Sequence, residues 1–356
     1  AHRMTGRLRS QANGVVLAFA LAVEAETGLI EGLNAQVIPG TGAQSAHSWE
    51  ALEAKFAELP GTATFYAAQV GPDGTMTTIR SWNPEARLGI GSTFKLYVLG
   101  ALAEMVRDGE TDWDQKLALR EEWKSLPSGV MQTEEAGTEH PLSEYALKMI
   151  SISDNTATDH LIRFVGRERV EAYMARFNDD PGRSTPFLTT RELFAMKLGD
   201  DRTLAERYIA SDVPFRRAML DEGGEVGKTV PSMVAAAVWT APMWIDALEW
   251  FATGEECGRA IVAVDLLAQD PKNAPAGQAM RANPGIGFDR SIWKAIAFKG
   301  GSEPGVLNLT WLVDRQDGAR FVLSVGWNNT EAAVDQNAFI DLAGQGFGLL
   351  AETPAP

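Results

Sequence analysis

A serine and a lysine lie three residues apart where an apolar segment begins, in Gly91-Ser92-Thr93-Phe94-Lys95. Apolar residues at helical spacing predict a helix over 93–107, so Ser92 and Lys95 share one face at its start. A serine hydroxyl becomes a nucleophile when a neighbouring base removes its proton. A lysine can be that base when it is neutral, which burial and nearby positive charge favour. The spacing indicates attack by Ser92 with Lys95 as base; the alternative is a helix-capping serine beside a surface lysine.

A second polar group, Ser153-Asp154-Asn155, lies between segments that predict helices over 142–150 and 156–164. A hydroxyl and an amide side by side can pass a proton and hold a substrate amide. The same residue types also cap helices, and that structural role explains them equally well.

A third group, Lys299-Gly300-Gly301-Ser302, follows one apolar strand and precedes another. Two glycines allow a ligand to approach the strand edge closely, and the N–H of Ser302 can then donate to an oxyanion. The alternative is a simple glycine turn between the two strands.

The three groups occur in the order and contexts of the S-x-x-K, S-D-N and K-T-G signatures. The chain therefore resembles the penicillin-recognising serine hydrolases, the class A β-lactamases and penicillin-binding proteins, over about residues 46–350. More closely, it resembles class-A-like serine hydrolases with a small N-terminal domain, whose clavulanate-cluster relatives are linked to ester and β-lactam hydrolysis. The resemblance implies a β-lactamase/transpeptidase-like fold and hydrolysis through an acylated serine.

The resemblance also implies the roles of individual side chains. Ser92 is the acylated nucleophile and Lys95 is its base. Ser153 relays a proton to the leaving group, and Asn155 holds a substrate amide. Lys299 attracts a substrate carboxylate and lowers the pKa values of Ser153 and Lys95.

The resemblance further implies an oxyanion hole formed by the N–H groups of Ser92 and Ser302. Gly300 and Gly301 are expected to line the substrate at the strand edge. Gly300 stands where K-T-G has threonine, which removes a hydroxyl that helps to hold a substrate carboxylate; Ser302 could substitute for it.

One segment of the class A pattern is missing. Those enzymes carry E-x-x-L-N before a T-T-P-like segment, and its Glu activates the water that hydrolyses the acyl-enzyme. Here NDDPGR at 178–183 leads directly to Ser184-Thr185-Pro186. Asp179 or Asp180 could replace the Glu, although a turn explains these residue types better. The short loop leaves acylation intact and predicts that small esters are hydrolysed faster than penicillins.

The order of the elements that must position these groups predicts an α/β (α+β) fold, in which helices flank an antiparallel sheet. Beyond those above, the expected elements are strands over 62–70, 75–82, 294–299, 306–313 and 321–327, and helices over 49–59, 167–177 and from about 331. The stretch 188–267 is expected to be a largely helical region, with Trp239, Trp244 and Trp250 in the core or along the cleft.

The N-terminal residues predict a separate small unit. Apolar runs at 15–23 and 29–38 flank a Gly-containing turn at 24–28 and indicate a β-hairpin. We expect residues 1–45 to be the remnant of a small domain and residues 46–356 the hydrolase domain. The competing interpretation is a signal peptide, with arginines at positions 3, 7 and 9 before the apolar run.

Composition restricts the partners. The 356 residues carry a formal charge of -15, which argues against nucleic acid or an anionic membrane as partner. One cysteine, Cys257, and four histidines without an H-E-x-x-H pattern predict no metal site, and no cofactor is expected. No apolar run reaches the ~18 residues of a membrane span.

We therefore expect a cofactor-free serine hydrolase that acts on small esters or β-lactams. The resemblance implies a periplasmic or secreted location. One alternative is a D-Ala-D-Ala carboxypeptidase or penicillin-binding protein. An alternative of another class is a β-lactam sensor or binding domain that does not turn over.

Overall fold

A five-stranded antiparallel sheet forms the centre of the computed structural model, which describes residues 2–12, 14–23, 30–42 and 45–354. Its strand order is β10 (Trp293–Glu303), β11 (Val306–Arg315), β12 (Arg320–Asn328), β4 (Thr62–Val70) and β5 (Met76–Trp82). The pairing of β12 with β4 joins the late strands to the early ones, as the sequence predicts.

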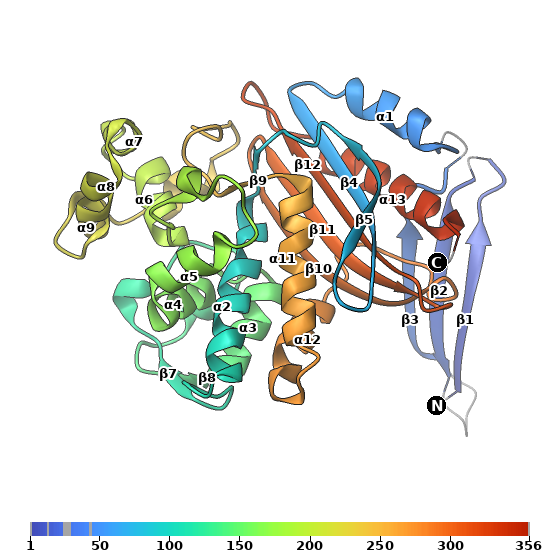
Figure 1. The fold of residues 1–356 in the computed structure, drawn as a ribbon, viewed down its shortest axis with the longest axis horizontal. Coiled ribbons are helices and arrows are strands. Elements are labelled where there is room, and N and C mark those ends of the chain that lie inside the picture. Colours follow the sequence, from blue (N-terminus) through green and yellow to red (C-terminus); the bar gives the residue numbers. More distant parts are fainter. Residues whose placement is uncertain (1, 13, 24–29, 43–44, 355–356) are drawn as a thin grey trace.

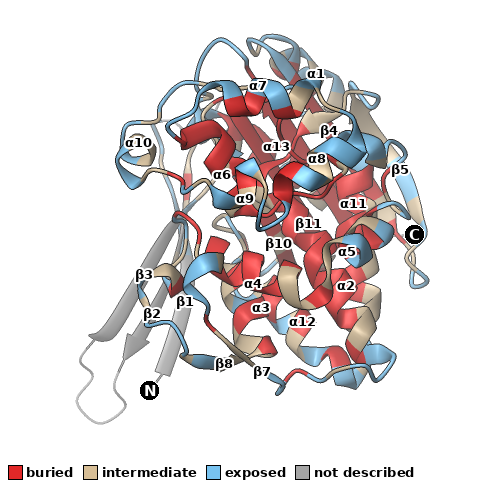
Figure 2. Cartoon of the chain, turned by 90° about the vertical axis from the view of Figure 1, so that its left-hand side faces the viewer, coloured by how far each residue is buried: buried red, intermediate tan, exposed pale blue. Residues whose placement is uncertain are grey.

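Helices cover both faces of this sheet (Figure 1). On one face lie α1 (Trp49–Ala57) and α13 (Gln336–Glu352), and on the other lies α11 (Gly254–Leu267) with α2 (Lys95–Arg107) against it. Side chains alternate between the two faces along β12, so this strand contributes to the hydrophobic core on each face. Phe321 and Leu323 pack toward α13, and Val322 packs toward α11. Figure 2 shows how buried residues gather in α2, α11 and the strands behind them.

A helical region extends from α2 away from the sheet (Figure 1). Its helices include α3 (Leu142–Ser151), α4 (Asn155–Val165), α5 (Arg167–Met174), α6 (Thr190–Leu198) and α12 (Ala274–Arg281). Between α6 and α11 the chain adds α7 (Thr203–Ala210), α8 (Val213–Leu220), α9 (Glu225–Lys228) and α10 (Met233–Ala237). Two small ladders pair β6 (Leu88–Gly89) with β9 (Phe251–Ala252) and β7 (Lys116–Ala118) with β8 (Glu139–Pro141). Among the described residues, every helix is too short or too polar to cross a bilayer.

Several predicted boundaries are wrong. The helix expected from 93 starts as a 3₁₀ turn over Gly91–Phe94 before α2. Residues 238–250, with their three tryptophans, contain no helix. The last helix begins at Gln336 and not near 331, because Asp335 caps it by accepting from the N–H groups of the two residues after Gln336.

The N-terminal segment forms a three-stranded antiparallel sheet in the order β1 (His2–Arg9), β2 (Val16–Val23), β3 (Ile30–Ile38). The predicted hairpin strands correspond to β2 and β3, and the predicted turn at 24–28 lies outside the described residues. The sequence did not reveal β1, because its arginines interrupt the apolar alternation. Hydrogen bonds tie the following segment to α13: Gly40 N donates to Asp341 at 2.8 Å and Ala46 N to Gln345 at 2.9 Å.

Candidate active site

One cavity of about 580 Å³ collects the three motifs from elements far apart in the sequence. It opens between the edge strand β10, the turn before α2 and the α3–α4 junction. Seven of the eight predicted site residues line it: Ser92, Ser153, Asn155, Lys299, Gly300, Gly301 and Ser302. A cavity with a few converging polar groups is the usual form of a small-molecule site.

The eighth predicted residue, Lys95, is fully buried beside this cavity. Its Nζ donates to the Ser153 carbonyl at 2.7 Å, to Ser153 Oγ at 3.1 Å and to Asn155 Oδ1 at 2.8 Å. Burial, followed by the nearby Lys299 ammonium, lowers the pKa of Lys95 well below its ordinary value. Lys95 is therefore not the surface lysine of the alternative interpretation, and its environment favours the neutral amine that a general base requires.

Lys299 contacts the same hydroxyl. Its Nζ donates to Ser153 Oγ at 3.1 Å and to its neighbouring carbonyl, that of Gly300, at 2.5 Å. Burial lowers the pKa of Lys299 to about 7. Ser153 Oγ is thus shared by two buried amines, an arrangement through which a proton can pass.

Asp154, the middle residue of Ser153-Asp154-Asn155, holds this junction in place. It caps α4 by accepting from Ala157 N at 2.8 Å, and its other oxygen accepts from the N–H groups of Val130 (2.6 Å) and Met131 (2.9 Å). The cap interpretation is therefore right for Asp154. Ser153 itself has φ +57, the left-handed conformation that lets its side chain meet both amines.

Asp154 itself leaves no room for a side chain at Gly129. Gly129 has φ +98, and a Cβ there would lie 2.2 Å from Asp154 Cγ. We expect Gly129→Ala to lower the free energy of unfolding by ~1–3 kcal/mol through strain and to slow acylation by displacing Asp154. Gly137→Ala is the matched control, since its φ is +90 with nothing within 4 Å. Urea unfolding and burst kinetics of both variants check this; equal loss of acylation in both would contradict it.

Two backbone segments meet where the oxyanion hole is predicted. A Cβ on Gly91, whose φ is +47, would lie 2.8 Å from Ser302 N, and a Cβ on Gly301 would lie 2.2 Å from Ser92 N. Only glycine at both positions lets the N–H groups of Ser92 and Ser302 lie this close together. Gly300 and Gly301 pair with Leu309 and Asn308 of β11, so they continue the strand and do not form a turn.

The carboxylates suggested as replacements for the missing Glu lie elsewhere. Asp179 forms an ion pair with Arg259 at 2.8 Å, and 71% of its side chain is exposed. Neither Asp179 nor Asp180 lines the cavity. Asp180 N donates to Asn178 Oδ1 at 3.0 Å, which is turn geometry and agrees with the structural interpretation of this segment.

Sequence reasoning missed two acidic residues of the cavity wall, Glu249 and Glu303. Both contact the buried Lys197. One signal was available: Glu303 follows Lys299 by four positions on β10, and side chains alternate along a strand, so the two share a face. Trp239 and Trp250 also line the cavity, and Trp250 stacks on Phe94.

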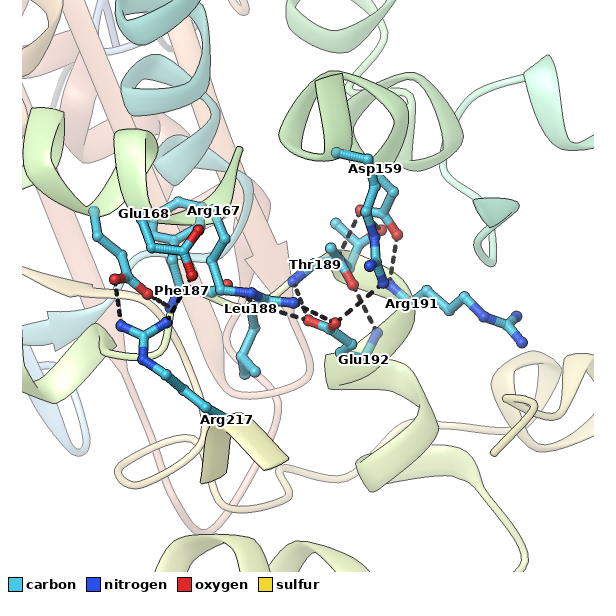
Figure 3. A network of polar contacts seen from close by, with 12 residues as sticks. Asp159, Arg167, Glu168, Phe187, Leu188, Thr189, Arg191, Glu192 and Arg217 are labelled. Atoms are coloured by element: carbon cyan, nitrogen blue, oxygen red, sulfur yellow. Dashed lines mark hydrogen bonds and ion pairs between the residues drawn. The ribbon is translucent and has the colours of Figure 1, made fainter. Parts of the chain in front are cut away.

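A polar network anchors the start of α6 (Figure 3). Glu192 accepts from Arg167 at 2.6 and 3.0 Å and completes a capping box with Thr189. Asp159 accepts from the N–H groups of Thr190 at 2.7 Å and Arg191 at 2.8 Å. Burial raises the pKa of Asp159 to about 7. The network fixes helix α6, which carries Thr190 at the cavity and Lys197 beside Glu249 and Glu303.

The described residues contain no group of three His, Cys, Asp or Glu side chains arranged to hold a metal ion.

The chain is similar to β-lactamases and to a penicillin-binding protein of known structure. Residues 47–196 match a family described as the beta-lactamase enzyme family. A β-lactamase from Sphaerobacter thermophilus is 20% identical with a TM-score of 0.57, over 86% of this chain and 98% of that one. An acyl-enzyme complex of a PBP-A mutant with penicillin G is 13% identical with a TM-score of 0.56, over 85% and 96%.

A β-lactamase from Francisella tularensis gives similar values, 13% identity and a TM-score of 0.56, over 83% of this chain and 97% of that one. No curated protein matches the sequence. At these identities the likeness establishes the fold.

Proposed function

We propose that this chain, which has the fold of the penicillin-recognising serine hydrolases and matches the beta-lactamase enzyme family over residues 47–196, hydrolyses small esters or β-lactams through an acyl-Ser92 intermediate. The observation that carries the proposal is the buried Lys95, within hydrogen-bond reach of Ser153 next to the Ser92 cavity. A buried amine whose pKa is lowered can accept the proton of a serine nucleophile, directly or through a neighbouring hydroxyl such as that of Ser153.

In the acylation step, the groups around the cavity act one after another. Lys95 accepts the Ser92 proton as Oγ bonds to the substrate carbonyl carbon. The N–H groups of Ser92 and Ser302 stabilise the oxyanion that forms. The bond from the carbonyl carbon to the leaving group then breaks as Ser153 passes a proton from Lys95 to that group. Asn155 and Lys299 orient the substrate through its amide and its carboxylate.

The direct test is the time course of product release from p-nitrophenyl acetate and from a chromogenic cephalosporin. We expect a burst equal to the enzyme concentration followed by steady turnover. Absence of both burst and turnover with every substrate would contradict the proposal.

A second candidate is a β-lactam sensor that is acylated without turnover. It is favoured by the loop of residues 178–186, whose carboxylates, Asp179 and Asp180, stay outside the cavity. A single burst with no steady phase would identify the sensor. A D-Ala-D-Ala carboxypeptidase would use the same acylation step and would release D-alanine from a peptide ending in D-Ala-D-Ala. For each of these functions we propose a periplasmic or secreted location.

The titration of Lys299 predicts a pH effect that depends on the substrate. Its pKa is lowered to about 7, so above that pH the free enzyme loses the positive charge that attracts a carboxylate. We expect the ratio of kcat/KM for a penicillin to kcat/KM for an uncharged ester to fall roughly fivefold from about pH 7 to about pH 8. Both reactions use Lys95 as the base, so the effect of its titration cancels in the ratio. Lys299→Ala should make the ratio independent of pH, and an unchanged slope in that variant would contradict the assigned role.

A further inference from the structure

Three charged side chains form a buried cluster on the wall of the cavity, outside the groups used for acylation. They are Lys197 of α6, Glu249 before β9, and Glu303 at the end of β10. The side chains are 0%, 1% and 6% exposed, respectively. Lys197 Nζ lies 2.5 Å from Glu303 Oε1 and 3.6 Å from Glu249 Oε1.

The charges of this cluster do not balance unless it binds a proton. One ammonium and two carboxylates would leave an unpaired negative charge away from water, which is costly. Burial raises the pKa of Glu303 well above its ordinary value, and the negative charge of Glu249 raises it further, although Lys197 opposes both effects. The two carboxyl groups therefore hold one proton between them, with one carboxylate remaining to act as a base.

The two carboxyl groups of the cluster border the same cavity as Ser92. Glu249 and Glu303 both line the cavity into which Ser92 opens. Glu303 directly follows Ser302, whose N–H belongs to the oxyanion hole. Glu249 is held close to the Ser92 segment: a Cβ on Gly89 would lie 3.0 Å from Glu249 Cγ, and Ile90 N donates to the carbonyl of Trp250 at 2.9 Å.

We propose that Glu249 is the general base that activates the water in hydrolysis of the acyl-enzyme. This inference rests on the proposed function and supplies the group that the shortened loop lacks. Glu249 takes a proton from water as the water oxygen bonds to the acyl carbon. The bond between that carbon and Ser92 Oγ then breaks, and the proton passes from Glu249 to Oγ. Ester and water thus become an acid and the free Ser92 hydroxyl.

The position of the base explains how a carboxylate can act without the class A loop. Residues 249 and 303 are separated by 54 positions, the first in the segment before β9 and the second in β10, and the fold brings them together around Lys197. The anchored start of α6 (Figure 3) fixes the helix that carries this lysine, and the lysine in turn holds both carboxyl groups at the cavity wall.

The test compares the burst and the steady phase in Glu249→Gln with those in the wild type. Glutamine keeps the size of the side chain but cannot accept the proton. We expect an unchanged burst rate and a steady rate ~10²–10⁴-fold lower, with acyl-enzyme accumulating by intact mass. The cluster remains neutral in this variant because Glu303 can ionise beside Lys197, and a full burst shows that the site is folded.

Two further variants serve as controls. Asp179→Asn removes a carboxylate of the short loop that does not line the cavity, and it should leave both phases unchanged. Glu303→Gln should slow the steady phase at least ~10-fold less than Glu249→Gln, because glutamine resembles the protonated form of Glu303. A larger effect in Glu303→Gln would assign the base to Glu303 and overturn the proposal.

The two proposals fail in distinguishable ways. A wild-type steady rate in Glu249→Gln would overturn the role of Glu249 while the acyl-Ser92 mechanism stands. Loss of the burst in the wild type would overturn the acyl-Ser92 mechanism itself.

Discussion

Replacing Ser92 with alanine is expected to abolish both turnover and covalent labelling. Ser92 opens into the cavity beside the buried Lys95, and removal of Oγ leaves no atom to carry the acyl group. Residual hydrolysis should be at least ~10⁴-fold below wild type, a loss of about 5.4 kcal/mol of transition-state stabilisation. The measurements are kcat/KM for p-nitrophenyl acetate and labelling by a fluorescent penicillin.

The fold should survive this change, because Ser92 lies in a 3₁₀ turn whose neighbours Thr93 and Phe94 carry the buried packing. Thermal unfolding within a few degrees of wild type is the control. Labelling that persists in Ser92→Ala at the wild-type rate would place the nucleophile elsewhere.

The second large effect is expected from Lys95→Arg. Arginine stays protonated at any working pH and cannot accept the Ser92 proton, so acylation should fall ~10²–10⁴-fold. The burst rate constant with a penicillin measures it directly. Near wild-type acylation in this variant would transfer the role of base to another group, with Ser153 as the first candidate.

Because Lys95 is fully buried, a larger arginine could also disturb packing. Lys95→Met tests this, since methionine has similar volume and no amine. Equal losses in the two variants, with similar unfolding temperatures, would attribute the effect to the missing base. Recovery of acylation in Lys95→Met would contradict it.

The motifs could be predicted from sequence because each has a local signature. The helix start at Ser92, the helix junction at Ser153 and the strand at Lys299 are each determined by a few neighbouring residues, and the cavity collects them as expected. The functional roles of these residues, and the boundary near residue 45, remain predictions.

The cluster of Lys197, Glu249 and Glu303 could not be predicted in the same way. Its members lie in α6, in the irregular segment before β9 and in β10, and no local pattern distinguishes Glu249 from an exposed acidic residue. The stretch that contains Glu249 was predicted to be helical, whereas the chain from 238 to 250 has no helix and leads into the short strand β9. Tertiary packing decides such segments, and local propensity does not.

The most direct test of the account is the intact mass of the protein at successive times after mixing with penicillin G and, separately, with p-nitrophenyl acetate. The acyl-Ser92 mechanism predicts one acyl adduct per molecule, on the peptide that contains Ser92, which forms rapidly and then disappears as product accumulates. Steady hydrolysis without any adduct, or an adduct on another residue, would contradict it.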